Sequence, residues 1–194
     1  MMKKFILIPI LALTCTAVFA QFKAQVGINI PNLSAPPLGR DFESNNGFTI
    51  GGSYMFGNQF YIEPGIQYAT FQYKFYRTLE PSEALDIDSR SIRIPLLFGG
   101  RFMPKDDNFN IRAFTGPSIS WVFSEDIDFK NLELDERNAV LWAWTVGYGV
   151  DYKMLFFEIS YDFGLSNYFE TQNYDSRNAK HNKLTLCLGV NLFR

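Results

Sequence analysis

The chain has 194 residues, with 18 basic against 20 acidic residues, one histidine and two cysteines. This length fits one domain, the charge balance argues against a nucleic-acid-binding protein, and so few His and Cys side chains leave little for a zinc site. Aromatic residues make up 17% of the chain beside a mean hydropathy of only -0.08. A helical membrane protein would carry long apolar runs and a clearly positive hydropathy, so that class is disfavoured too.

Residues 1–20 have the organisation of a secretory signal peptide. Lys3-Lys4 is the charged segment, residues 5–13 are the apolar segment, and Val18-Phe19-Ala20 supplies small residues at the positions that a signal peptidase reads. We expect cleavage near Ala20-Gln21. The alternative, a membrane anchor, is disfavoured because the apolar run is too short and no stop-transfer charges follow it.

The mature domain, residues 21–194, would keep a single thiol at Cys187. One thiol cannot form an internal disulfide, which excludes a disulfide-stapled exported scaffold. Cleavage also removes two lysines and no acid, so the domain would carry 16 basic and 20 acidic residues.

Eight stretches of the mature chain alternate apolar and polar residues with a period of two, which is typical of β-strands. In the last of them, Leu184, Leu186 and Leu188 alternate with Thr185 and Cys187. The pattern predicts strands at roughly 22–30, 47–56, 59–74, 90–103, 109–123, 139–152, 154–169 and 182–194.

The connectors between these stretches alternate in length. Gly57-Asn58, 104–108 and the break near Lys153 are short, whereas long polar segments occupy 31–46, 75–89, 124–138 and 170–181. Short turns at one end and long loops at the other are typical of bacterial outer-membrane barrels. The predicted fold is therefore all-β: an eight-stranded antiparallel up-and-down transmembrane β-barrel.

A soluble β-sandwich would alternate in the same way, but the glycines argue against it. Nine of the 14 glycines fall in the polar register, where a solvent-facing strand would gain nothing from them. The interior of an eight-stranded barrel is narrow, so small residues there let larger side chains cross it. The polar register is therefore predicted to face the lumen.

Charged residues share this inward register. With the N-terminus in the periplasm, a lumen charge network is predicted near the periplasmic end, and two further charges lie above it. The network comprises Glu63, Arg101, Arg112, Asp151 and Glu158, and the upper charges are Arg93 and Asp162. Buried ions need partners, so we interpret the network as a structural plug; a proton or ion path would use the same residue types.

Three tryptophans share the outward register at the outer end of one predicted hairpin. Trp121 ends an upward strand, and Trp142 and Trp144 begin the next downward strand. This position is typical of the outer aromatic girdle of a membrane barrel. A carbohydrate-stacking site is the functional alternative.

Five blocks in order resemble the PorT-like outer-membrane β-barrel family of Bacteroidota. They are Glu63-Pro64-Gly65-Ile66-Gln67-Tyr68, Arg93-Ile94-Pro95-Leu96-Leu97, Thr115-Gly116-Pro117-Ser118, Gly147-Tyr148-Gly149-Val150 and Tyr161-Asp162-Phe163-Gly164-Leu165-Ser166-Asn167. The resemblance implies an eight-stranded barrel in the outer membrane and little chemistry; its namesake is associated with type IX secretion and gliding. Such barrels usually finish on a terminal Phe, whereas here Arg194 follows Phe193.

Catalytic and metal-binding patterns are weak. His181 has no nucleophile placed beside it by any recognisable spacing, so neither an enzyme nor a cofactor is expected. The pairs Asp86/Asp88 and Asp126/Asp128 could hold a divalent cation, but no glycine-centred calcium loop surrounds them. We interpret them as a solvated acidic rim that could meet the divalent ions bridging lipopolysaccharide, and no metal site is assigned.

The sequence therefore predicts a monomeric, non-catalytic protein of the Gram-negative outer membrane. Its expected role is structural or surface-interacting, through four outer loops, with a link to secretion or envelope assembly as one form of that role. The expected partners are outer-membrane lipid, lipopolysaccharide and envelope proteins, with no nucleic acid. The alternative is a small pore or carrier for solutes, and a lipid-modifying enzyme comes third.

Overall fold

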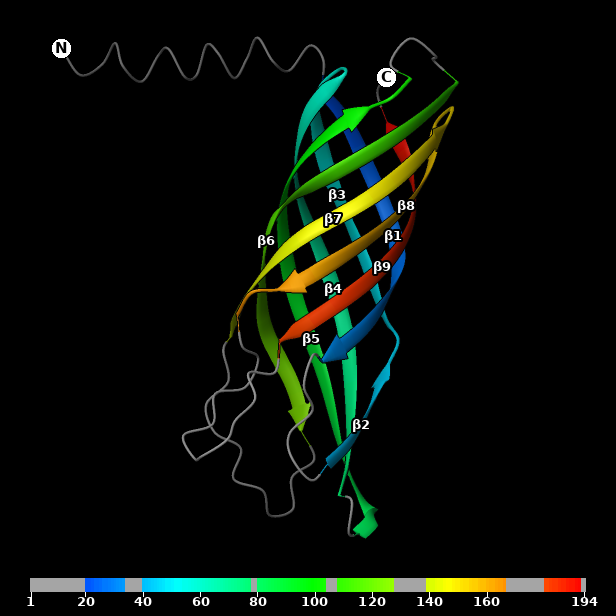
Figure 1. Cartoon of the computed structure of the whole chain (residues 1–194). Coiled ribbons are helices and arrows are strands. Elements are labelled where there is room, and N and C mark those ends of the chain that lie inside the picture. The colour runs from blue at the N-terminus through cyan, green and yellow to red at the C-terminus, as the bar shows by residue number, and fades with distance from the viewer. Residues whose placement is uncertain are drawn as a thin grey trace, which may run out of the picture.

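A computed structural model describes residues 20–33, 40–77, 80–103, 108–127, 139–166 and 180–192. The predicted signal peptide and the chain end at Phe193 and Arg194 lie outside the described residues, except for Ala20. Figure 1 shows strongly tilted strands that close into a tube. No helix among the described residues is long and apolar enough to cross a bilayer.

The wall is built from strands that follow one another around the tube. Their bounds are β1 Ala20–Leu33, β2 Arg40–Asn45, β3 Gly47–Gly57, β4 Phe60–Arg77, β5 Glu80–Arg101, β6 Phe109–Ile127, β7 Val140–Tyr152, β8 Leu155–Gly164 and β9 His181–Leu192. Only Asn46 separates β2 from β3, and both pair with β4. The two therefore act as one wall strand, and the barrel has eight strands.

Every neighbouring pair of wall strands is antiparallel, and the chain ends close the barrel. β1 pairs with β9 from Phe22↔Leu192 to Leu33↔His181, while β4 pairs with β5 on the opposite side of the tube. The predicted fold class, a closed eight-stranded antiparallel barrel, is confirmed.

Strand lengths differ from the prediction at the end with the long connections. The segment 75–89, predicted as a loop, is mostly strand: β4 continues to Arg77, β5 begins at Glu80, and Tyr73 pairs with Ile87. β8, by contrast, ends at Gly164 rather than 169. Beyond the lipid, a strand needs only a backbone partner, so polar residues can continue the ladder where the apolar alternation has ended.

Side chains alternate between the two surfaces of the wall as the period of two requires. On β1, Val26 and Ile28 face outward and are about half exposed, whereas Lys23 and Asn29 face inward and are fully buried. Apolar outside and polar inside is the arrangement of a barrel that spans lipid. The buried interior is therefore the lumen itself.

The two ends of the barrel differ. The short turns β3–β4, β5–β6 and β7–β8 gather at the end where β1 begins and β9 finishes (Figure 1). Gly57 has a φ of 118° in the first turn and Lys153 a φ of 54° in the third. Following the topology of outer-membrane barrels, we call this the periplasmic end and the opposite end, with the longer connections, the outer end.

Candidate functional site

Five charged side chains meet inside the periplasmic half of the tube, and we call them the lower tier: Lys23, Glu63, Arg112, Asp151 and Glu158. The Lys23 Nζ donates to Glu63 Oε1 at 2.7 Å and to Glu158 Oε1 at 2.5 Å. The Arg112 guanidinium lies 2.8 Å from Asp151 Oδ2, 2.8 Å from Glu158 Oε1 and 3.7 Å from Glu63 Oε2. The tier therefore joins β1, β4, β6, β7 and β8 across the lumen.

The lower tier is buried and tightly surrounded. Lys23 and Arg112 are 0% exposed and Glu63 is 3% exposed. The Phe156 ring lies beneath both cations, 4.5 Å from Lys23 Nζ and 5.6 Å from Arg112 Cζ. Both cation–ring distances lie within the range of cation–π attraction, so the ring adds to the carboxylates in holding the cations inside.

The absence of a side chain at Gly149 leaves space for the charged side chains of the lower tier. A Cβ at this position would lie 3.0 Å from Glu158 Cγ and 3.1 Å from Arg112 Nη2. Gly149 pairs with Arg112 on one side and Glu158 on the other, so a side chain here would push into the ion pair between its two neighbours. A glycine in the inward register therefore makes space for the charges next to it.

Arg101 belongs to the lumen charge network predicted from the sequence. In the structure its side chain contacts residues outside the lower tier. Its Nη2 donates to Gln21 Oε1 and lies 2.7 Å from Met55 Sδ, and its Cζ lies 5.9 Å from the Tyr61 ring. Arg101 sits directly opposite Arg112 in the β5–β6 ladder. Like charges opposite each other repel, which explains why the two guanidinium groups take different partners.

A second cluster crosses the lumen nearer the outer end, and we call it the upper tier: Gln67, Arg93, Thr145, Asp162 and Lys183. Arg93 donates to Gln67 Oε1 at 2.8 Å, to Thr145 Oγ1 at 2.7 Å and to Asp162 Oδ1 at 2.8 Å. Lys183 Nζ lies 3.3 Å from Asp162 Oδ2. Asp162 is thus shared by two cations and also accepts from Thr145 Oγ1 at 2.7 Å.

Sequence reasoning did not include Lys23 or Lys183 in the charged clusters. Both are in the inward register: Lys23 is two residues before Gln25, and Lys183 is two residues before Thr185. The alternation therefore places both lysines inside the barrel, whereas the predicted network included charged residues from other strands only. With the two lysines included, β1 and β9 also contribute to the charged interior.

Apolar side chains fill the space beside the lower tier. Met55, Tyr61, Leu97 and Phe114 form a buried cluster, and Leu97 pairs with Glu63 across β4 and β5. The lumen is therefore packed with side chains at this level, as expected for so small a barrel.

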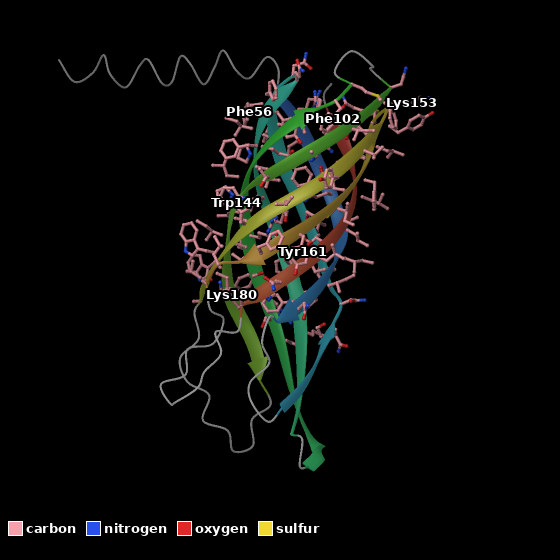
Figure 2. The ribbon with its side chains drawn as sticks, in the orientation of Figure 1. Phe56, Phe102, Trp144, Lys153, Tyr161 and Lys180 are labelled. Atoms are coloured by element: carbon pink, nitrogen blue, oxygen red, sulfur yellow. The ribbon has the colours of Figure 1, made fainter. Side chains whose placement is uncertain are left out.

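The predicted outer girdle residues all face outward at the outer half of β6 and β7. Trp121, Trp142 and Trp144 are 63%, 49% and 44% exposed, and Trp144 Nε1 donates to Thr115 Oγ1 at 2.8 Å. Figure 2 shows Trp144 on the outer surface of the tube. An indole whose N–H is bonded and whose ring faces outward suits the boundary between lipid and water.

His181, Cys187 and Ser166 carry the side chains with nucleophilic or acid–base potential, and each has identified surroundings. The His181 ring packs on Phe71 with centroids 4.7 Å apart, and the Cys187 thiol is buried on the lumen side, where Cys187 pairs with Glu158. Ser166 Oγ accepts from the Trp142 backbone N–H at 2.9 Å. Within the described residues, no three His, Cys, Asp or Glu side chains are close enough together to hold a metal ion.

Comparison with known families identifies this architecture. A family described as "Outer membrane protein beta-barrel domain" matches residues 19–170. The chain belongs to this family. The match extends from the start of β1 to beyond β8, and β9 completes the barrel after it. The protein is an outer-membrane β-barrel protein, and this family implies the Gram-negative outer membrane as its location.

A solved structure shares the fold at low sequence identity. OprG from Pseudomonas aeruginosa is 12% identical, with 89% of this chain and 93% of that chain covered and a TM-score of 0.56. Ail from Yersinia pestis is 12% identical, with 89% and 97% covered and a TM-score of 0.43. No curated protein matches the sequence at a significant level. The similarity to OprG concerns the fold alone and assigns no role to this protein.

Proposed function

We propose that this protein is a closed, non-catalytic outer-membrane barrel that anchors a surface-interacting outer end. The observation that carries the proposal is the lower tier, in which Lys23 and Arg112 are fully buried among three carboxylates. A solute could pass only by separating these pairs. Removing one partner of a buried ion pair costs about 3–5 kcal/mol, because it leaves an uncompensated buried charge.

A pore or carrier is the second candidate, because the upper tier is polar. Several small hydroxyl side chains line that level, including Ser91, Ser118 and Thr145. These side chains are nevertheless buried, and Ser91 Oγ donates to the Ala69 carbonyl at 3.3 Å. Their hydrogen bonds stay within the wall and the upper tier, which favours a packed lumen over a water-filled one.

Conductance of planar bilayers separates these two candidates. The purified full-length protein should insert without steady single-channel current, while a known porin in the same bilayers gives open-channel steps. A Lys23→Ser/Arg112→Ser variant removes both lower-tier cations and tests whether the tier is what blocks passage. Steady current from the unmodified protein would reject the closed-lumen proposal.

A lipid-modifying enzyme remains the third candidate and has its own readout. Incubating the reconstituted protein with outer-membrane lipids should yield no new lipid species by mass spectrometry. A product that disappears in His181→Ala would replace the non-catalytic proposal with an enzymatic one.

Export and a finer family membership complete the proposal. The signal-peptide pattern of residues 1–20 supports cleavage near Ala20-Gln21, which N-terminal sequencing of the membrane-purified protein would test.

The five sequence blocks support a PorT-like barrel of Bacteroidota with a role in secretion or envelope assembly. Co-purification with secretion components from outer membranes would support that role, and a monomer by analytical ultracentrifugation in detergent is expected.

A further inference from the structure

An apolar groove of about 440 Å³ lies on the outward surface of β4, β5, β6 and β7. Four of its residues form one row across three neighbouring ladders: Phe60↔Gly100, Gly100↔Ala113 and Ala113↔Tyr148. Phe60 and Tyr148 are both exposed, so their rings face away from the lumen. Two small residues therefore form the floor of the groove between two large rings.

The next row towards the outer end continues the groove with uncharged side chains. Phe98 pairs with Thr115, and Thr115 pairs with Val146. The Thr115 hydroxyl is already bonded, since its Oγ1 accepts from Trp144 Nε1 at 2.8 Å and donates to the Thr145 carbonyl oxygen at 3.0 Å. Within the described residues, every side chain that lines the groove is uncharged. The groove therefore offers contact surface to an apolar group and no ionic partner to a lipid headgroup.

Two glycines, Gly52 and Gly100, lie in the outward register, and their surroundings differ. A Cβ added at Gly52 would lie 3.1 Å from the Phe22 ring, so this ring covers the glycine. Apart from its chain neighbours, a Cβ added at Gly100 would have no heavy atom nearer than 3.8 Å. Gly100 therefore has open space above it on the membrane side of the wall.

The open space suggests a reason for a glycine at position 100. A glycine inside a strand weakens it, and it often marks a bulge, a bend or a place where another molecule approaches closely. The β4–β5 ladder shifts register at Tyr76/Arg77 and the β5–β6 ladder at Arg90/Ser91, both far from Gly100. A bulge therefore does not explain Gly100, and the uncovered floor favours close approach by another molecule.

The groove faces the periplasmic leaflet of the membrane. Phe60 is the first residue of β4 and Gly100 is the next-to-last residue of β5, so both lie beside the short turns of the periplasmic end. The surrounding surface is the apolar outward face of the wall, on which Ile62 and Val150 are exposed. In a membrane barrel this face contacts acyl chains, and the groove is continuous with it.

The width of the groove favours a single chain over a helix. Phe60 and Tyr148 are on strands three spacings apart, which is about 14 Å. The Phe60 ring fills the first spacing, because its edge lies 3.8 Å from the Cβ position of Gly100. The remaining floor is about 10 Å wide before the Tyr148 ring is counted, whereas a helix with its side chains is about 10–12 Å across. A single extended acyl chain is much narrower and can lie on Gly100 and Ala113.

We propose that this groove binds one acyl chain of a phospholipid from the periplasmic leaflet. The chain lies on Gly100 and Ala113, and its methylene groups gain dispersion contacts with the rings of Phe60 and Tyr148. The 440 Å³ of the groove lie within the roughly 300–1,000 Å³ typical of small-molecule sites. Because the lining side chains are uncharged, the site recognises the chain and not the headgroup. This inference goes beyond the proposed function, since it concerns the outward surface and does not depend on a closed lumen.

The test uses the full-length protein in detergent micelles and a phosphatidylethanolamine that carries a diazirine in the middle of one acyl chain. Detergent replaces loosely held lipid, so only a chain with a binding site is labelled in a saturable way. After irradiation, mass spectrometry of the intact protein counts the attached lipids, and peptide mapping locates them. Labelling should saturate at no more than one lipid per protein, on the residues of β5, β6 and β7 that line the groove.

Two substitutions fill the floor of the groove, and a third is the matched control. Ala113→Leu should abolish the saturable labelling. Gly100→Val fills the floor from the neighbouring strand, meets no close contact at its Cβ, and should abolish the labelling as well. Ala24→Leu makes the same change as Ala113→Leu at another outward alanine, which pairs with Gly52 outside the groove, and should leave the labelling unchanged. Heat-modifiable migration on gels checks that every variant is folded.

The outcomes separate an acyl-chain site from other occupants. A phosphatidylglycerol with the same photoreactive chain should label the groove equally, whereas labelling that depends on the headgroup would overturn acyl-chain recognition. Labelling that never saturates, that spreads evenly around the barrel, or that survives both floor-filling substitutions would overturn the site itself. A dimer in analytical ultracentrifugation that Ala113→Leu converts to a monomer would assign the groove to a second copy of this chain and would equally overturn the proposal.

Discussion

Arg112→Met is the sharpest perturbation of the lower tier. Methionine keeps an unbranched chain in the same space and removes only the charged head. The unmodified tier has two cations and three carboxylates, a net charge of -1, and the variant has one cation and three carboxylates, a net charge of -2. Asp151, whose Oδ2 lies 2.8 Å from Arg112, loses this cation altogether.

The part of this cost that comes from the added negative charge depends on pH. The variant can bind one proton on a carboxylate and so return to a net charge of -1. Protonating a carboxylic acid of ordinary pKa, about 3.9, costs about 4 kcal/mol at pH 7 and about 1.5 kcal/mol at pH 5. The value at pH 7 agrees with the 3–5 kcal/mol typical of a broken buried pair. Because the folded variant takes up a proton that the unfolded chain does not, its deficit against the unmodified protein should shrink as the pH falls.

The free energy of unfolding is measured by urea titration in phospholipid vesicles at pH 7 and pH 5, with the folded fraction read from heat-modifiable migration. Lys153→Met is the matched control, since it removes an exposed cation whose contact is the Tyr152 ring at 5.5 Å. The control should cost less than about 1 kcal/mol at either pH. A deficit for Arg112→Met as small as that of the control, or one that grows on acidification, would refute a buried ion cluster.

Two further substitutions test the upper tier and the close packing of the lumen. Asp162→Asn leaves Arg93 and Lys183 without their shared carboxylate and should cost about 3 kcal/mol in urea titrations; a loss below about 1 kcal/mol would indicate that water solvates this tier. Gly99→Ala places a Cβ in steric conflict with the phenol end of Tyr61 and should cost about 1–3 kcal/mol, and Tyr61→Leu in the same chain should recover much of this loss; no recovery would contradict the assigned contact.

The period of two in the sequence was enough to predict most of the fold. Alternation on each strand separates inward from outward residues, so Glu63, Arg112, Asp151 and Glu158 could be assigned to one lumen without knowing any distance. The length contrast between connectors supplied the antiparallel order. Both signals are local in the chain, which is why a single sequence was enough to recognise them.

The position of each residue along the barrel axis was harder to predict than the surface of the wall that it faces. The register of a tilted barrel is staggered from strand to strand, so neighbours across the wall depend on the shear as well as on alternation. The sequence predicts Arg101 in the same charge network because this residue faces inward near the same end. Its position directly opposite Arg112 became visible only with the β5–β6 register, and this register accounts for its turn towards Gln21 and Met55.

The sequence did not predict that β4 continues to Arg77 and that β5 begins at Glu80, and the reason is different. Inside the membrane, lipid on one side forces alternation; beyond it, both faces of a strand meet water and the pattern disappears. Residues 75–89 therefore look like a polar loop although the backbone pairs as a hairpin. Only long-range pairing distinguishes such a strand from a loop, and composition does not report it.

The glycines and the buried charges of this lumen are one feature rather than two. Gly149 lies between Arg112 and Glu158 in the ladder, and a Cβ there would sit 3.1 Å from the guanidinium and 3.0 Å from the glutamate Cγ. A larger residue would separate the ions, and an unpaired ion would in turn have no place in so narrow a tube. A small residue beside large charged ones thus gives each side chain its space, and the same packing that stabilises the wall also closes the lumen.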